Sequence, residues 1–282
     1  EQLIMNRYTK LTLLREILVW VAALILLSPF YFLVNIAIKS RQDSIDTPSF
    51  EPALRPTLEN FAHVLGSETS GTLYLGLFNS MLIVVVAVFG LIVVGSVTAY
   101  VLARRTSKLS KTAFYMILIG IVVPAQLGLV PLYIGAQALG LLGSPIGLGV
   151  VYIAMLMPLS VFLYAGFVRA LPTEDEEAAN IDGASRIRTY IQVVFPLLAP
   201  ATGTVATMAG IIIWNDFFTP LIFLGGSANP TLPVVIYSYV GEFNIEWNNI
   251  FSVLIIAMIP ITVVYLIFQK KFIQGFSGGI KS

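Results

Sequence analysis

Long windows without Asp, Glu, Lys or Arg constrain this chain more than any other feature of its sequence. The longest window runs from Thr112 to Val168 and holds 57 residues. One membrane helix needs about 20 mostly apolar residues, so this window fits two helices joined by a turn. Gly and Pro residues cluster between Gly140 and Gly147, which predicts the turn there.

Four shorter windows each fit one helix, so the sequence predicts an all-α, polytopic membrane protein with six spans. Only 11% of the residues are charged, against about 25% in soluble domains, so lipid must replace water around much of the chain. Residues 17–282 are expected to form one six-span transmembrane domain. The predicted spans are 17–38, 77–103, 112–135, 147–168, 197–223 and 248–269.

The distribution of Lys and Arg predicts the orientation of the spans, because these residues accumulate in cytoplasmic loops. With the N-terminus inside, the cytoplasmic segments carry 13 of the 16 basic residues, and the outer segments carry Lys39, Arg41 and Arg55. Both termini are therefore expected in the cytoplasm. Residues 1–16 and 270–282 would be cytoplasmic, and residues 224–247 would form an extracytoplasmic loop.

Several classes of function lack support in the sequence. The net charge of +1 argues against a nucleic-acid partner, and the absence of cysteine excludes a Cys-based metal site. We find no Ser/His/Asp set, no metal-ligand spacing and no phosphate-binding loop of the Gly-x-x-x-x-Gly-Lys-Ser/Thr type. The chain is therefore not expected to be an enzyme or to bind ATP through such a loop.

Residues 171–196, which follow the fourth span, form an unusually long and acidic cytoplasmic segment. The pair Thr173 and Glu176 has the spacing of a capping box, which predicts a helix start. Gly183 reaches positive φ without strain and would end that helix, while a second helix would run from about Ala184 towards Pro196. The result would be a helix–turn–helix whose Ala/Gly corner suits a groove on another protein. The segment holds five of the 15 acidic residues, namely Glu174, Asp175, Glu176, Glu177 and Asp182.

This segment resembles the EAA loop of binding-protein-dependent ABC importers. The resemblance rests on Glu177-Ala178-Ala179, Gly183 and Pro196; Val193 and Phe195 replace the Ile and Leu of the family pattern but stay apolar. Residues 177–200 are similar to the carbohydrate branch of that family, and more specifically to the smaller permease subunit of the maltose type. Further agreement comes from Trp214-Asn215-Asp216-Phe217-Phe218, from Thr231-Leu232-Pro233 and from the Gly-rich tail 275–281.

The resemblance implies a type I importer permease fold and a set of partners. The EAA loop would be the coupling helix that docks in a cleft of a separate ATPase dimer, which binds ATP and Mg while this chain carries no cofactor. A second, homologous permease subunit would complete a heterodimer, and an extracytoplasmic sugar-binding protein would deliver the substrate. The location would be the cytoplasmic (inner) membrane of a bacterium or archaeon. The coupling residues carried over are Glu177, Ala178, Ala179, Asp182, Gly183 and Pro196.

Asp216 is the only acidic residue flanked on both sides by long apolar windows, and intramembrane charge commonly marks function. With Trp214 and Asn215 it would offer a sugar an aromatic face and hydrogen-bonding groups. The competing interpretation is that Asp216 pairs structurally near the outer interface.

Two more segments are assigned to partners through the resemblance. Asn229, Pro230, Tyr237 and Tyr239 would contact the binding protein, although an aromatic interface belt explains such residues equally well. The tail residues Gly278, Gly279 and Lys281 would reach the ATPase, with a frayed end as the alternative.

The function expected is therefore a permease subunit of an ATP-driven sugar importer that works by alternating access. An ABC importer permease for a non-sugar solute would carry the same loop. A secondary transporter would normally show an inverted repeat and intramembrane coupling charges, and it needs no EAA loop. A membrane-embedded enzyme is disfavoured by the missing site chemistry.

Overall fold

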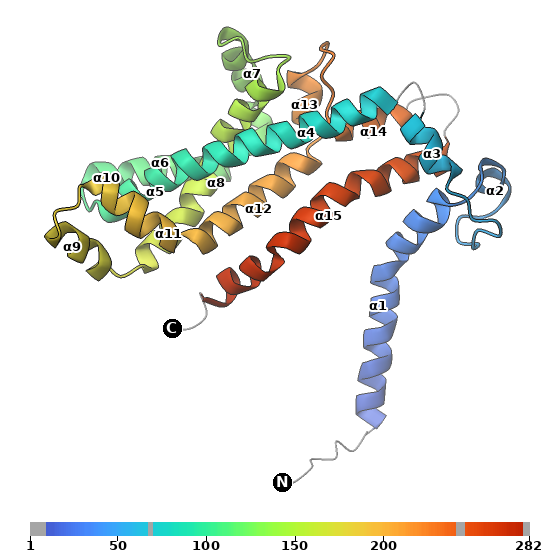
Figure 1. Ribbon diagram of the computed structural model, residues 1–282, viewed down its shortest axis with the longest axis horizontal. Coiled ribbons are helices and arrows are strands. Elements are labelled where there is room, and N and C mark those ends of the chain that lie inside the picture. The colour runs from blue at the N-terminus through green and yellow to red at the C-terminus, as the bar shows by residue number, and fades with distance from the viewer. Residues whose placement is uncertain (1–9, 67–69, 241–245, 279–282) are drawn as a thin grey trace. The chain divides into compact units, whose positions relative to one another are not determined.

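The computed structural model describes residues 10–66, 70–240 and 246–278, and every regular element in these ranges is helical (Figure 1). Two compact units divide the chain: Glu1–Ser70 with Tyr239–Met258, and Gly71–Ser238 with Ile259–Ser282. The first unit contains α1 (Lys10–Ala37), α2 (Arg41–Asp46), α3 (Glu59–Gly66) and the beginning of α15 (Trp247–Gly278). The second is built mainly from α4 (Ser70–Gly90), the π-helical turn η1 (Leu91–Gly95), α5 (Ser96–Arg104), α6 (Lys108–Val122), the 3-10 turn η2 (Ala125–Gly128), α7 (Leu129–Ala138), α8 (Pro145–Ala170), α9 (Glu174–Ile181), α10 (Arg186–Thr189), the π-helical turn η3 (Tyr190–Val194), α11 (Phe195–Leu197), α12 (Ala199–Asn215), α13 (Phe218–Phe223) and α14 (Leu232–Val240).

Three helices of the described chain are long and apolar enough to cross a membrane on their own. Within a bilayer the helix satisfies all backbone polar groups internally, which explains why such apolar segments fold this way. They are Leu11–Ala37, Gly71–Arg104 and Pro145–Ala170.

Two further apolar segments are bent pairs of helices. The bend is 101° between Lys108–Val122 and Gln126–Ala138, and 72° between Arg186–Leu197 and Ala199–Asn215. If each pair is one span, the described residues contain up to five, and Trp247–Val263 adds a shorter apolar helix. The all-helical class is confirmed, whereas six spans stay a prediction.

The segment expected as the span 112–135 is not one continuous helix. Helix α6 ends at Val122 because Pro124 lacks a backbone N–H and disfavours helical geometry at the residue before it. Val123 is accordingly extended, with φ −71° and ψ 123°. The turn expected near 140–147 is present: Gly140 and Gly143 adopt φ of 69° and 72° before α8 begins at Pro145.

Helix α8 lies at the centre of the second unit and packs against α5, α6 and α12. Glycines on the α4–α5 rod allow this close approach. A Cβ added at Gly90 would lie 2.1 Å from the side chain of Ile153, and one at Gly95 would lie 2.2 Å from Oγ of Ser160. Ser160 also donates a hydrogen bond of 3.1 Å to the Leu91 carbonyl in η1, so the π-helical turn is held directly against α8.

A buried polar cluster organises the first unit. Asn60 donates hydrogen bonds of 2.7 Å to the carbonyls of both Ala37 and Lys39, and Asn248 donates one of 2.7 Å to the Asn60 side chain. The ammonium of Lys39, itself 1% exposed, donates to Thr47 Oγ1 at 2.7 Å. These bonds tie the end of α1 to the start of α15 within this unit.

Candidate functional site

The predicted helix–turn–helix after α8 is confirmed, and its corner is a glycine-capped helix end. Gly183 has φ +80°, the left-handed region that favours glycine. Its N–H donates to the Asn180 carbonyl at 3.1 Å, and the N–H of Ala184 donates to the Ala179 carbonyl at 3.0 Å. These two bonds form the Schellman pattern. Ser185 then caps the start of α10. The chain thus turns sharply between α9 and α10 and leaves the corner open.

The capping box expected at the start of α9 is wrong. Thr173 makes no side-chain cap hydrogen bond; its hydroxyl donates to Glu177 Oε1 at 2.9 Å. The Glu176 carboxylate points instead towards a guanidinium and a phenol on α5. A charge-assisted pair of this kind outweighs one hydrogen bond to a backbone N–H.

That interaction joins α9 to the end of α5. Arg104 lies 2.6 Å (Nη2) and 2.8 Å (Nε) from Oε1 of Glu176, and the Tyr100 hydroxyl donates to Oε2 at 2.8 Å. Arg104 also donates to the Leu171 carbonyl at 3.1 Å. The Arg104 and Glu176 side chains are only 20% and 13% exposed. The first helix of the acidic segment is therefore fastened to the rod that contains α4, η1 and α5.

The outward side of the corner presents apolar groups beside charged ones. Ile181 is 86% exposed, and Ala178 and Asp182 are also exposed. Large aliphatic side chains left open within a charged segment commonly mark a surface that another protein covers. Glu177 is exposed on the same helix.

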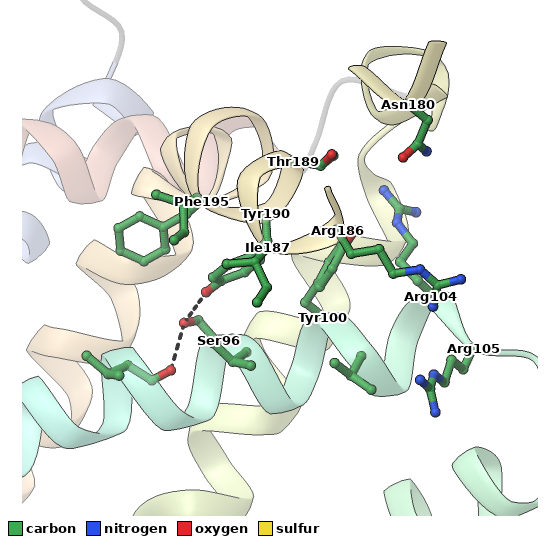
Figure 2. A pocket seen from close by; sticks show the side chains of 14 residues that line it. Ser96, Tyr100, Arg104, Arg105, Asn180, Arg186, Ile187, Thr189, Tyr190 and Phe195 are labelled. Carbon is green, nitrogen blue, oxygen red and sulfur yellow. Dashed lines mark hydrogen bonds between the residues drawn. The ribbon is translucent and has the colours of Figure 1, made fainter. Parts of the chain in front are cut away.

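Behind the corner lies a pocket of about 810 Å³ between α5 on one side and α10 with η3 on the other (Figure 2). The hydroxyls of Ser96 and Tyr190 meet across it at 2.7 Å. Tyr190 opens the π-helical turn η3, and Ser96 directly follows η1. Such turns are rare and are frequent at functional sites.

Asp216 lies at the break between α12 and α13 and has all its acceptors engaged from within the chain. Its Oδ1 accepts the N–H groups of Phe218 at 2.9 Å and Thr219 at 3.2 Å, which caps α13. Its Oδ2 accepts the hydroxyls of Tyr152 at 2.9 Å and Thr219 at 2.5 Å. The carboxylate therefore fixes the break between α12 and α13 to α8.

The two residues before Asp216 differ in access. Trp214 is 8% exposed and belongs to the packed interior. Asn215 is exposed, and its side chain donates to the Ile211 carbonyl at 2.8 Å. Of the three predicted pathway residues, Asn215 is the one whose side chain is open to a ligand.

The residues assigned to the outer loop divide in a similar way. Asn229 donates to the Gly143 carbonyl at 3.0 Å, and the Pro230 carbonyl accepts from Asn79 at 2.9 Å. Both contacts lie within the second unit and hold residues 229 and 230 in place there. Tyr237 is 59% exposed. Tyr239 is half-buried, and Gly278 is the last residue of α15, whereas Gly279 and Lys281 lie outside the described residues.

A family model described as the binding-protein-dependent transport system inner membrane component matches residues 92–278. The chain belongs to this family. It is a membrane-embedded transport subunit and not an enzyme. The matched range of this permease begins in η1 and includes the acidic segment, the pocket and the Asp216 corner.

Two curated relatives of the permease align over nearly its whole length. The melibiose/raffinose/stachyose import permease protein MelC of Bacillus subtilis (strain 168) is 33% identical over 252 residues, which are 89% of this chain and 90% of the relative. The multiple sugar-binding transport system permease protein MsmG of Streptococcus mutans is 32% identical over 270 residues, or 94% and 95% of the two chains.

A solved structure has the same fold as this permease. A chain in the crystal structure of a bacterial ABC transporter involved in the import of the acidic polysaccharide alginate superposes with a TM-score of 0.84. The match covers 95% of this chain and 100% of the other at 19% identity. The ABC importer permease fold expected from the EAA resemblance is therefore confirmed.

Sequence reasoning missed the contacts that hold the permease's acidic segment in place. Tyr100 and Arg104 were not singled out because they lie more than 70 positions from Glu176. The sequence does show that Arg104 directly follows a charge-free window. Basic residues are common at the cytoplasmic ends of membrane helices, so this position did not indicate a specific partner. In the part of the chain that is described, no group of three or more His, Cys, Asp or Glu gathers as metal ligands.

Proposed function

We propose that this permease is the transmembrane subunit of an ATP-driven importer of a sugar, with a disaccharide or oligosaccharide as the favoured cargo. The similarity to MelC and MsmG supports a sugar, since both names refer to sugar transport and both alignments span about nine-tenths of each chain or more. An importer for a non-sugar solute is the alternative, because the coupling segment would be the same.

The α9–α10 corner is the observation that carries the proposal. The helix end and turn that suit a groove on an ATPase subunit are capped by glycine, and they contain Glu177, Ala178, Ala179, Asp182 and Gly183. Pro196 begins the return from this segment to α12. ATP and Mg would be bound by the ATPase dimer. Closure of that dimer would push the α9–α10 corner and open the substrate pathway between the permease subunits to the outside.

The proposed topology is six spans with both termini in the cytoplasm of a bacterial or archaeal cell, in its cytoplasmic (inner) membrane. Residues 17–38, 77–103, 112–135, 147–168, 197–223 and 248–269 are the spans, and 171–196 is the cytoplasmic coupling segment. The 13 basic residues on the inner side support this orientation.

The substrate is proposed to pass the Trp214–Asp216 segment. Asn215 would contact the sugar, whereas Asp216 would hold the break between α12 and α13 in place through its bonds to Tyr152 and Thr219. A second, homologous permease subunit would form the other wall of the pathway as half of a heterodimer.

The outer loop would meet an extracytoplasmic sugar-binding protein. Exposed Tyr237 is available for that contact, while Asn229 and Pro230 would support the loop from behind. Tyr239 is also proposed to contact the binding protein, and the tail residues Gly278, Gly279 and Lys281 are proposed to reach the ATPase.

The decisive experiment is to purify this chain with its partner subunits and measure ATP hydrolysis stimulated by the binding protein across mono-, di- and trisaccharides. We expect one group of sugars to raise ATPase activity and to enter proteoliposomes. Co-purification of an ATPase with stimulation only by a non-sugar solute would replace the sugar by the alternative cargo. Transport without any ATPase would overturn the coupling proposal.

A further inference from the structure

The pocket behind the corner has two chemically different ends (Figure 2). One end is lined by aliphatic and aromatic groups, including Val97 and Phe195, and the other is lined by arginines. The lining residues come from η1, α5, α9, α10, η3 and α11, with Arg105 directly after α5, so they all belong to the second unit. None of its described lining residues is acidic.

The apolar end is formed by two facing rows of side chains. Val93, Val97 and Val101 recur every fourth residue along η1 and α5, and they are 46%, 42% and 38% exposed. Across from them, Ile187 and Ile191 are 73% and 57% exposed. Residues four apart share one helix face, so each wall presents a continuous aliphatic stripe that the described chain leaves uncovered. An apolar ligand chain fits between such stripes.

The charged end holds two guanidinium groups without a counter-ion. Arg104 is neutralised by Glu176, but the guanidinium groups of the exposed Arg105 and Arg186 make no hydrogen bond or ion pair with any described residue. Figure 2 shows Arg105 and Arg186 on the same side of the pocket, away from Phe195. Guanidinium groups bind phosphate through paired hydrogen bonds, so this end suits a phosphate-bearing headgroup.

The apolar and charged ends of the pocket match its position along the apolar helix Gly71–Arg104. Helix α5 completes the apolar segment Gly71–Arg104, so the valine stripe lies along its last turns and the arginines follow where it ends. We infer that this pocket binds an anionic phospholipid. Its phosphate is held by Arg105 and Arg186, and its acyl chain lies along Val93, Val97 and Val101. Assignment to the cytoplasmic leaflet rests on the proposed orientation.

A lipid held there joins the span to the coupling segment. The headgroup contacts Arg105 next to α5 and Arg186 at the start of α10, so it adds to the link that Arg104 and Glu176 already make. Movement of the corner then changes the width of the lipid site.

The test uses the whole transporter purified in detergent. It is titrated with phosphatidylglycerol and, separately, with phosphatidylcholine that has the same acyl chains, and bound lipid is counted by native mass spectrometry. Wild type is expected to prefer phosphatidylglycerol. R105Q and R186Q should each weaken its binding roughly fivefold, and the double variant about thirtyfold, since each basic residue contributes about 1 kcal/mol near a membrane surface.

Two further variants keep the inference open to refutation. R188Q is the matched control, because Arg188 donates to Gln192 and does not line the pocket. V97W fills the apolar end without removing charge and should displace the lipid. Equal loss in R188Q, unchanged binding in the double variant, or unchanged binding in V97W would each overturn the site.

A competing occupant gives a different result. If an apolar helix of the partner permease fills the pocket, the wild type shows no preference between the two lipids and V97W weakens recovery of that subunit. Sugar-stimulated ATPase activity is measured on the same wild-type preparation. Its absence would refute the proposed function and leave the lipid count as a separate result.

Discussion

The Arg104 guanidinium lies 2.6 Å from the Glu176 carboxylate and joins the last turn of α5 to the first turn of α9. The two residues lie 72 positions apart in the sequence, and both side chains are largely buried. Tyr100 adds a second donor to the same carboxylate. The acidic segment 171–196 is thus attached to the apolar helix Gly71–Arg104 by a charged contact as well as by the chain itself.

Replacing Glu176 with Gln should loosen this attachment. The amide cannot form the ion pair, and a hydrogen bond to a charged group contributes about 1.5–3 kcal/mol. We expect lower thermal stability of the purified complex and weaker coupling of binding-protein-stimulated ATP hydrolysis to uptake. The measurements are the temperature of aggregation and the number of sugars transported per ATP.

Glu174→Gln is the matched control for that variant. Glu174 is exposed and lies in the same first turn, so its replacement by Gln removes the same charge without breaking the Arg104 contact. Its replacement should leave the ratio of sugar to ATP near the wild-type value. An equal fall in both variants would indicate a general effect of acidic charge near the helix start, and the proposed role of the Arg104 contact would be rejected.

Gly183 offers a test of the corner itself. A Cβ there would meet nothing within 4 Å, so the cost of a substitution comes from its φ of +80° rather than from crowding. Gly183→Val should disfavour the corner by about 1–2 kcal/mol or more, whereas Gly183→Asn should be tolerated because Asn adopts this conformation more readily. Uptake at equal complex yield should fall severalfold for Val and little for Asn. Wild-type uptake in the Val variant would refute the coupling assignment.

Gly95 tests the contact between the rod and α8. Gly95→Ala would place a Cβ 2.2 Å from Ser160 Oγ, and overpacking of this kind costs about 1–3 kcal/mol. Ser160→Ala removes that oxygen and also its hydrogen bond to Leu91. The double variant should therefore be more stable than the sum of the single effects predicts. Additive losses of thermal stability would show that the two residues do not compete for space.

Much of the architecture could be predicted from the sequence because it follows from local rules. Apolar windows predict helices, Gly and Pro predict the turn at 140–147, and Gly183 predicts the corner, since each depends on the conformational preferences of neighbouring residues. The break at Pro124 was also visible as a proline, but its 101° consequence depends on how α6 and α7 pack.

The site could be predicted only in part because its contacts are not local. Thr173 and Glu176 have the spacing of a capping box, yet Arg104 and Tyr100 draw the Glu176 carboxylate away. Spacing along one helix cannot reveal a competitor from another helix. The same reason applies to Asp216, whose partner Tyr152 lies 64 positions earlier.

Asn215 and Asp216 are adjacent, and the structure assigns them separable effects. Asp216→Ala removes the cap of α13 and the bond to Tyr152, so it should lower the stability of the complex by about 0.5–2 kcal/mol. Asp216→Asn keeps an acceptor and should lose less stability.

Asn215→Ala removes only one exposed hydrogen bond, so the thermal stability of this variant should match wild type. Uptake should show a raised KM if the Asn215 amide contacts the sugar. Both quantities are measured on proteoliposomes with equal amounts of complex. An unchanged KM and rate for Asn215→Ala would remove this residue from the proposed pathway, and an unchanged stability for Asp216→Ala would contradict the capping role.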